Sequence, residues 1–228
     1  MLDAVLLEWE GVLADTGGAR RDAMLRALAD EGVHWTAAAY DACCGALDVH
    51  GAAGAALAFA GRHDPVLVQL VALRATRAFA ERLANGFTLQ PGASHFVAAA
   101  ESRARLAIVT RASRSETEIA LRLSGLEDSF ALVVTADDVL DPPPAPALYV
   151  SALALLSRRR AVRADAAVAI VDGLAAVRAA RGAGARALIV GAPAHVAIEA
   201  DAAADNLDGL TVDAITALVG VLSEGRPA

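Results

Sequence analysis

The stretch VLLEWEGVLADT, residues 5–16, decides how the rest of the chain is interpreted. It begins with a short apolar run, continues through Glu8 and Glu10, and turns at Gly11. A continuous apolar run of this length, bounded by a turn signal, is typical of a β-strand that is buried on both faces. Two acidic side chains at the carboxyl end of such a strand indicate a site at that edge of a sheet.

The composition is that of a globular protein of 228 residues, which is long enough to bury a sizeable core. The hydrophobic fraction of 56% owes much to alanine, and the sequence has no run of 18 or more clean apolar residues to span a bilayer. Acidic residues at positions 3, 8 and 10 replace the basic start of a signal peptide, so we expect a cytoplasmic protein. The net charge of −7 disfavours nucleic acid and anionic membranes as partners.

Two residue types limit the chemistry that the chain offers. Cys43 and Cys44 are adjacent, a spacing that suits neither a disulfide nor a metal-ligand pair, so we expect both to be buried or half-buried in a helix. The chain contains no lysine, and all 20 of its strongly basic side chains are arginine. A site that needs a permanent positive charge must therefore use arginine.

Strands and helices alternate from about residue 90 onward. Apolar runs typical of buried strands occupy residues 106–110, 131–135, 167–172 and 187–191. Helical patterns lie between them at residues 113–124, 146–157 and 174–183. Together with the first strand, this alternation predicts an α/β fold, a Rossmann-like doubly wound parallel sheet covered by helices.

Residues 17–89 carry helical periodicity and no strand candidate. We expect about four helices here, inserted after the first strand as a helical cap domain. The core domain would then comprise residues 1–16 and 90–228. Glycines and a proline mark the two linkers, near residues 15–18 and 86–92.

Polar residues stand at the carboxyl ends of the predicted strands: Glu8, Glu10, Thr110, Asp137, Asp138 and Asp172. Because ligands of open parallel sheets bind outside these ends, we expect the side chains to converge on one crevice. Carboxylates beside a hydroxyl, with the helix amides that follow Gly11 and Thr110, suit Mg²⁺ and a phosphate group. The competing interpretation is that the acids simply begin solvated loops.

Four segments resemble, in order and spacing, the motifs of the haloacid dehalogenase superfamily, in the capped branch that contains phosphoglycolate phosphatase and beta-phosphoglucomutase. EWEGVLADT (8–16) resembles the first motif, DxDGVLxDT, and IVTR (108–111) resembles the second, a strand ending in Thr or Ser. PPAPALY (143–149) resembles the third motif, KPAPDxY. VDGLAAVRAARGAGA (171–185) resembles the fourth, EDSxxGVxAAxAAGM, and the resemblance extends from Val5 to about Leu222.

The resemblance implies a Mg²⁺-dependent phosphatase site. In the family one aspartate attacks phosphorus and a second acts as general acid and base, and these positions are Glu8 and Glu10 here. The hydroxyl and the lysine that hold the phosphoryl group correspond to Thr110 and Pro143. The implied metal ligands are Glu8, Glu10 and Asp172.

Four of the six carried-over positions depart from the family pattern: Glu8, Glu10, Pro143 and Val171. Glutamate in place of aspartate keeps the charge but moves the carboxylate by about 1.5 Å, and a misplacement of about 1 Å can cost on the order of a hundredfold in rate. Pro143 offers neither the charge nor the donors of lysine, a loss worth about 3 to 4 kcal/mol. Val171 removes an oxygen ligand from the metal site.

Arginines beside the expected crevice offer a replacement for the missing lysine. Arg111, Arg114 and Arg20 all lie next to positions that should face it, and Gly11 opens the turn whose amides would meet a phosphate. The implied phosphate-binding set is therefore Thr110, Arg111, Arg20 and Gly11. The alternative is that the arginines are solvated side chains at a helix start and on a cap helix.

The sequence favours a phosphatase-like protein whose chemistry is lost or strongly reduced, a pseudoenzyme that binds a small anion, a metabolite or a protein partner. The alternative is an active Mg²⁺-dependent phosphatase of a small phosphorylated metabolite, with Glu8 in place of the aspartate. Metal-independent dehalogenation is less favoured, because it also needs a positive partner for the leaving group or the substrate acid. Nothing in the sequence names a substrate or an oligomeric state.

Overall fold

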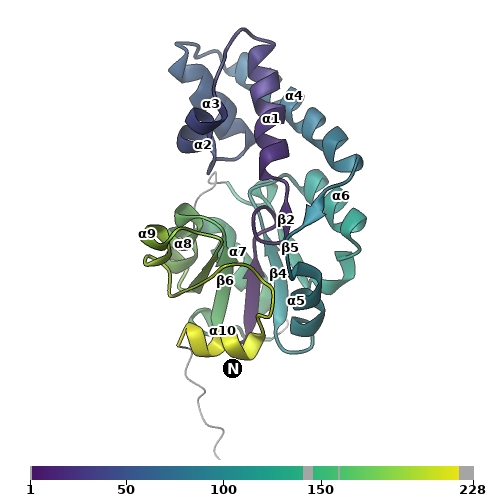
Figure 1. Cartoon of the computed structure of the whole chain (residues 1–228), viewed down its shortest axis with the longest axis vertical. Coiled ribbons are helices and arrows are strands. Elements are labelled where there is room, and N and C mark those ends of the chain that lie inside the picture. Colours follow the sequence, from purple (N-terminus) through teal and green to yellow (C-terminus); the bar gives the residue numbers. More distant parts are fainter. Residues whose placement is uncertain (1, 141–145, 159, 221–228) are drawn as a thin grey trace, which may run out of the picture.

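A parallel sheet of six strands forms the centre of the computed structural model, which describes residues 2–140, 146–158 and 160–220 (Figure 1). The strands are β1 (Ala4–Leu7), β4 (Arg105–Val109), β5 (Leu132–Val134), β6 (Ala167–Val171), β7 (Arg186–Val190) and β8 (Ala202–Ala204). Their order in the sheet is β5-β4-β1-β6-β7-β8, and every pair is parallel. The chain therefore moves outward from β1 to β5 and returns to the other side of β1 with β6, which confirms the predicted doubly wound α/β fold.

The apolar runs form strands because both faces of the sheet are covered. All four residues of β1 are fully buried, and they alternate between two cores. Val5 and Leu7 join one cluster, whereas Ala4 and Leu6 join the other. A strand buried on both faces has no polar side to display, which explains the unalternating apolar pattern of the sequence.

Helices from different parts of the chain cover the two faces. The face of Leu7 is covered by α5 (Ala93–Ala100), α6 (Arg114–Ser124) and α10 (Val212–Leu218). The face of Leu6 is covered by α7 (Ala147–Ser157), α8 (Leu174–Gly182) and α9 (Ala194–Ala197). Figure 1 shows these helices around the lower part of the molecule.

A helical unit follows β1 and lies at the top of Figure 1. It consists of α1 (Gly17–Ala29), α2 (Ala37–Cys44), α3 (Val49–Phe59) and α4 (Pro65–Ala84). These helices share a third cluster of buried residues, in which Leu28, Leu57 and Val71 are fully buried. The lower part of α4 also contributes Phe79 and Leu83 to a core cluster of the sheet. The division into a cap and a core domain stays a prediction.

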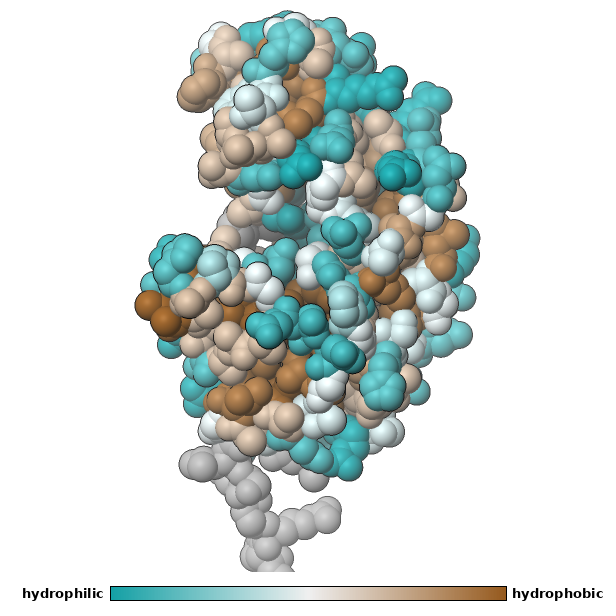
Figure 2. Space-filling model, viewed as in Figure 1, coloured by the Kyte–Doolittle hydropathy of each residue, from teal (hydrophilic) through white to brown (hydrophobic). Residues whose placement is uncertain are grey.

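The helical unit stands apart from one side of the sheet. In Figure 2 the surface is hollowed between the upper helices and the part below that carries α8 and α9. Within the described ranges, no single helix is both long and apolar enough to cross a membrane. Only α2 and α3 taken together meet that test of length and composition, across a bend of 115°.

Three details differ from the expectations. Residues 17–89 do contain a strand, β3 (Thr88–Leu89), which pairs antiparallel with β2 (Ala14–Asp15). Strands of two residues are too short for a periodic pattern. The second difference is β8, which was not expected because its three alanines lack the side chains that favour strands. Cys43 is exposed although Cys44 is buried, because neighbouring residues of a helix point about 100° apart.

Leu57 and Leu123 provide a matched test of where the helical unit is held together. Leu57 is fully buried in α3, whereas Leu123 on α6 is 53% exposed. We expect Leu57→Ala to lower the free energy of unfolding by about 2 to 5 kcal/mol, and Leu123→Ala to change it by about 0.5 kcal/mol or less. Urea denaturation followed by circular dichroism measures both, and equal losses would contradict the assignment of the third core.

Candidate functional site

The carboxyl ends of β1, β4 and β6 meet below the helical unit, and the residues that follow these strands form the candidate site. Glu8, Thr110 and Asp172 each come directly after one of the three strands. They line a small cavity of about 60 Å³ together with Arg111 and Tyr149. This edge is the place where open parallel sheets bind their ligands, next to the point where the strand order reverses.

Glu8 and Asp172 form a close pair of carboxyl groups. Glu8 Oε2 accepts a hydrogen bond from the backbone N–H of Asp172 at 3.2 Å, and Glu8 Oε1 lies 3.5 Å from the hydroxyl of Tyr149. Burial and the Asp172 carboxylate raise the pKa of Glu8 to about 8. Glu8 is therefore mostly neutral at pH 7.

Tyr149 contributes a proton donor to this pair. Burial and the charge of Glu8 raise the pKa of the Tyr149 hydroxyl well above its usual value. The hydroxyl consequently keeps its proton at neutral pH and points a donor toward Glu8. The side chain is held in place by α7, where Tyr149 is 3% exposed.

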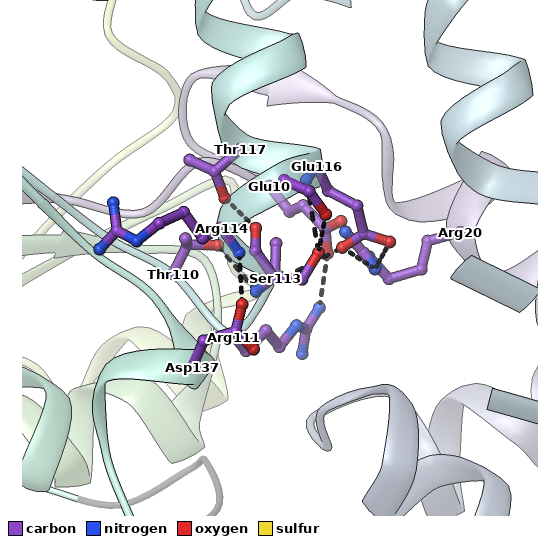
Figure 3. A network of polar contacts seen from close by, with 11 residues as sticks. Glu10, Arg20, Thr110, Arg111, Ser113, Arg114, Glu116, Thr117 and Asp137 are labelled. Atoms are coloured by element: carbon purple, nitrogen blue, oxygen red, sulfur yellow. Dashed lines mark hydrogen bonds and ion pairs between the residues drawn. The ribbon is translucent and has the colours of Figure 1, made fainter. Parts of the chain in front are cut away.

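Glu10 belongs to a separate network of buried ion pairs, shown in Figure 3. Its carboxylate is 5% exposed, with one oxygen bound by Arg20 Nε and the other lying 3.4 Å from a guanidinium nitrogen of Arg111. Arg20 also reaches Glu116, 2% exposed, at 3.1 Å. Burial alone would raise the pKa of Glu10, but the charges of Arg20 and Arg111 lower it, so Glu10 is ionised.

The two arginines join the helical unit to the sheet. Arg20 lies on α1, and its guanidinium stacks 4.0 Å above the centre of the Phe79 ring on α4. Arg111 follows β4 and donates to the backbone carbonyl of Gly45, between α2 and α3. The positions of three helices of the helical unit are therefore coupled to side chains of the sheet edge.

The start of α6 is occupied by side chains of the chain itself. Glu116 Oε2 accepts from the backbone N–H of Ser113 at 3.1 Å, and Ser113 Oγ accepts from the backbone N–H of Glu116. Asp137 accepts from the backbone N–H of Arg114 at 2.8 Å (Figure 3). The Arg114 side chain binds Asp138 at 2.6 Å, so this guanidinium is not directed at Glu8.

Gly11 and Thr110 also have partners within the chain. The amide of Gly11 donates to the carbonyl of Ala14 at 2.9 Å, and Thr110 Oγ1 accepts from the backbone N–H of Ala112 at 3.1 Å. Gly11 has a φ of +76°, and a Cβ atom there would overlap the carboxylate of Asp172. The turn after β1 is therefore tightly packed against the residue that follows β6.

Among the described residues, side chains provide two carboxylates for a Mg²⁺ site, those of Glu8 and Asp172. Within the described part of the chain, no group of three or more His, Cys, Asp and Glu side chains is placed to hold a metal ion. Glu8 and Asp172 face each other, but the carboxylate of Glu10 is held by arginines. Val171 is a fully buried strand residue, so it adds no oxygen ligand.

The structure brings together four of the predicted site residues around the small cavity: Glu8, Thr110, Arg111 and Asp172. Glu10 and Arg20 lie in the adjoining ion-pair network, and the lysine position, Pro143, falls outside the described residues. The roles assigned to all of these residues stay predictions.

Sequence reasoning missed Tyr149 and Glu116 as parts of the site. The signal that could have drawn attention to Glu116 is its spacing from Ser113, which predicts a capping box at a helix start. That pattern explains the local hydrogen bonds, but it does not predict that Arg20, 96 residues away, binds the same carboxylate. Tyr149 lies in the third motif, yet nothing in the sequence indicates its contact with Glu8.

The profile of the haloacid dehalogenase-like hydrolases matches residues 11–190, and the chain belongs to this family. CbbY from Rhodobacter sphaeroides, solved in complex with phosphate, is 26% identical over 94% of this chain and 99% of that chain, with a TM-score of 0.78. A mutant of that protein was solved in complex with xylulose-(1,5)bisphosphate. The similarity to CbbY therefore extends over nearly the whole length of both chains.

Two further solved structures share the fold at lower identity. Beta-phosphoglucomutase from Clostridium difficile is 15% identical over 96% of this chain and 98% of that chain, with a TM-score of 0.85. YfnB from Bacillus subtilis, bound to magnesium, is 16% identical over 96% of this chain and 99% of that chain, with a TM-score of 0.67. No curated protein sequence matches the chain.

Alanine substitutions at Gly11 and Gly61 distinguish the cost of backbone strain from the cost of crowding at the site. Both have positive φ, +76° and +72°, but a Cβ atom at Gly61 would meet nothing within 4 Å. We expect Gly61→Ala to lower the free energy of unfolding by about 1 to 2 kcal/mol, and Gly11→Ala to lower it by a further 1 to 3 kcal/mol or so because of the overlap with Asp172. Urea denaturation of the two variants gives the difference, and equal losses would show that Asp172 can move away freely.

The raised pKa of Glu8 makes stability depend on pH. The folded state holds this proton up to about pH 8, whereas the unfolded chain releases it near the ordinary glutamic acid value of 4.5. The free energy of unfolding of the wild type should therefore fall, relative to Glu8→Gln, as the pH rises from about 4.5 to about 8. The limiting slope is about 1.4 kcal/mol per pH unit. Urea titrations at several pH values measure it, and a difference that is constant with pH would contradict the buried neutral Glu8.

Proposed function

We propose that this haloacid dehalogenase-like hydrolase has lost its phosphatase activity or retains only a strongly reduced one, and that it binds a small ligand between its helical unit and its sheet. The observation that carries the proposal is the position of Glu10 between Arg20 and Arg111. By resemblance, Glu10 stands at the acid/base position of the family. Its two carboxylate oxygens are engaged by guanidinium groups, so neither is directed at a leaving group.

Releasing Glu10 for proton transfer would be costly. Breaking a buried ion pair leaves an uncompensated charge, and the typical cost is about 3 to 5 kcal/mol. Arg20 would then face only Glu116 on its other side, at 3.1 Å. A barrier raised by this amount slows a reaction by roughly two to four powers of ten.

The space beside Glu8 also argues against turnover of a metabolite. The cavity of about 60 Å³ holds roughly four water molecules. Sites for small organic ligands usually measure about 300 to 1,000 Å³. A phosphorylated sugar therefore does not fit against Glu8 unless the helical unit moves away from the sheet, and Arg20 and Arg111 oppose that movement.

The positive groups that phosphoryl transfer requires are already neutralised in this chain. Arg111 is the one arginine among the described residues that line the small cavity, and two of its N–H groups donate to Glu10 and to the carbonyl of Gly45. Phosphoryl transfer depends on positioning and on stabilising negative charge, so a site without a free cation is poorly suited to it. The absence of lysine from the sequence leaves only other arginines as substitutes.

Phosphate release tests the proposal directly. Purified wild type and Glu8→Ala are incubated with Mg²⁺ and p-nitrophenyl phosphate, glucose 1-phosphate, phosphoglycolate or xylulose 1,5-bisphosphate. We expect both proteins to release phosphate at the same background rate, because the wild type has no working nucleophile and acid pair. Circular dichroism confirms that the variant is folded.

Turnover that is present in the wild type and disappears in Glu8→Ala would refute the proposal. It would favour instead an active Mg²⁺-dependent phosphatase of a small phosphorylated metabolite that uses Glu8 in place of the family's aspartate. Equal rates of phosphate release in the two proteins would support ligand binding as the role of the crevice.

A further inference from the structure

A second and much larger cleft lies beside the candidate site. It is bordered by α3 and α4 of the helical unit and by the loops that follow β4 and β5. Its volume is about 650 Å³, within the range of about 300 to 1,000 Å³ found for small-molecule sites. Arg111 lines both the small cavity and this cleft, so its side chain stands in the wall between them.

One wall of the cleft is apolar and uncovered. It is formed largely by α4, where Val66 is 73% exposed, Leu70 37% and Leu73 67%. Large aliphatic side chains at these exposures, gathered on one side of a cleft, gain free energy when a ligand covers them. The wall therefore suits the apolar part of a ligand.

Polar and acidic side chains line other parts of the cleft. Ser113 and Ser115 carry hydroxyl groups, and Asp48 at the start of α3 and Asp137 after β5 carry carboxylates. The basic side chains among the described lining residues are Arg111 and His50. Arg111 donates to Glu10 and to the carbonyl of Gly45, and His50 Nε2 lies 3.1 Å from Gln69 Oε1. The cleft therefore presents more negative than positive charge to a ligand.

Two backbone amides at the start of α6 that could attract a phosphate already bind carboxylates of the chain. At the start of α6, the N–H of Ser113 donates to Glu116 and the N–H of Arg114 donates to Asp137. A phosphate placed there would have to displace two carboxylates of the chain and would then be repelled by them. Helix amides attract an anion only when they are unpaired, and here the anion is already supplied by the protein.

We infer that this cleft binds a small amphipathic molecule that carries no phosphate group, with its apolar part against α4 and an uncharged hydroxyl or a positive amino group toward Asp48 and Asp137. This inference rests on the proposed function, because it names the ligand class of a protein that no longer hydrolyses phosphate esters. The inferred ligand class differs from that of the solved relative, which was crystallised with xylulose-(1,5)bisphosphate.

Three probes with one apolar part and different head groups test the preference: 2-phenylethylamine, 2-phenylethanol and 2-phenylethyl phosphate. Each is titrated into the full ¹⁵N-labelled chain, and amide chemical shifts report both the position and the Kd. We expect the amine and the alcohol to shift amides of α3, α4 and the start of α6, and the phosphate to bind there at least tenfold more weakly. The inference is overturned if the phosphate binds the cleft as tightly as the amine, or if neither the amine nor the alcohol binds there at 10 mM.

Charge-removing variants test the role of the two carboxylates. Asp48 and Asp137 each accept a backbone N–H, from Gly51 and Arg114, and asparagine keeps an oxygen for that bond. In the double variant Asp48→Asn/Asp137→Asn we expect the amine to bind at least threefold more weakly and the alcohol to bind unchanged. Unchanged binding of the amine would overturn the assignment of these carboxylates.

Asp64→Asn is the matched control. Asp64 caps α4 through the N–H of Val66, as Asp48 caps α3, but it does not line the cleft, so the affinity for the amine should stay that of the wild type. Phosphate release from 2-phenylethyl phosphate with Mg²⁺, compared with Glu8→Ala, keeps the two proposals distinguishable. Phosphate release by the wild type that disappears in Glu8→Ala would refute the proposed loss of phosphatase activity. The order of the three Kd values tests only the inferred ligand class.

Discussion

The half-buried guanidinium of Arg20, held between the buried carboxylates of Glu10 and Glu116, is the interaction on which the arrangement of the two units depends. It connects the loop after β1 and α1, which are close in the sequence, with α6, where Glu116 lies 96 residues after Arg20. A charge at this depth is tolerated only with its partners, because an isolated buried ion is strongly unfavourable. Phe79 beneath the guanidinium extends the same constraint to α4.

The side chain of Glu10 cannot both hold this ion pair and act as a general acid. A general acid has to be free to approach a leaving group and to exchange a proton with it. Glu10 is instead a fixed and ionised partner of two arginines. The carboxylate of a glutamate extends about 1.5 Å further from the backbone than that of an aspartate, and at position 10 this longer side chain ends against Arg20. The position that resembles a catalytic one therefore serves to hold the helical unit to the sheet.

The fold was largely predictable because its signals are local and repeated. The run at residues 106–110 became β4 (Arg105–Val109), and the pattern at residues 113–124 became α6 (Arg114–Ser124), each within a residue at its ends. Burial on both faces produces such runs whatever the details of the site. By contrast, β8 consists of three alanines, whose small side chains carry little preference for a strand, so its pattern gave no signal.

The site was predictable only in part, because its decisive contacts are not local. Glu8, Thr110 and Asp172 could be placed at one edge, since the carboxyl ends of parallel strands meet there. Which arginine binds which carboxylate depends on how α1 and the loop after β4 approach that edge, and no spacing in the sequence encodes it. The prediction that Arg20 or Arg111 meets a phosphate stays a prediction, and the sequence gives no sign that both guanidinium groups also bind Glu10.

Arg111 explains why the two cavities differ in character. A guanidinium is planar and always charged, and it satisfies carboxylate and carbonyl oxygens in several directions at once. In a chain without lysine, this side chain lies where the small cavity and the large cleft meet, and its donors face Glu10 and Gly45. The charge of Arg111 lowers the pKa of Glu8, but burial and the Asp172 carboxylate raise it more, to about 8. The large cleft, on the other side of Arg111, is lined by the carboxylates of Asp48 and Asp137. The half-buried side chain of Arg111 thus places one positive charge at the boundary of both cavities, while Glu10 and the carbonyl of Gly45 take up two of its N–H groups.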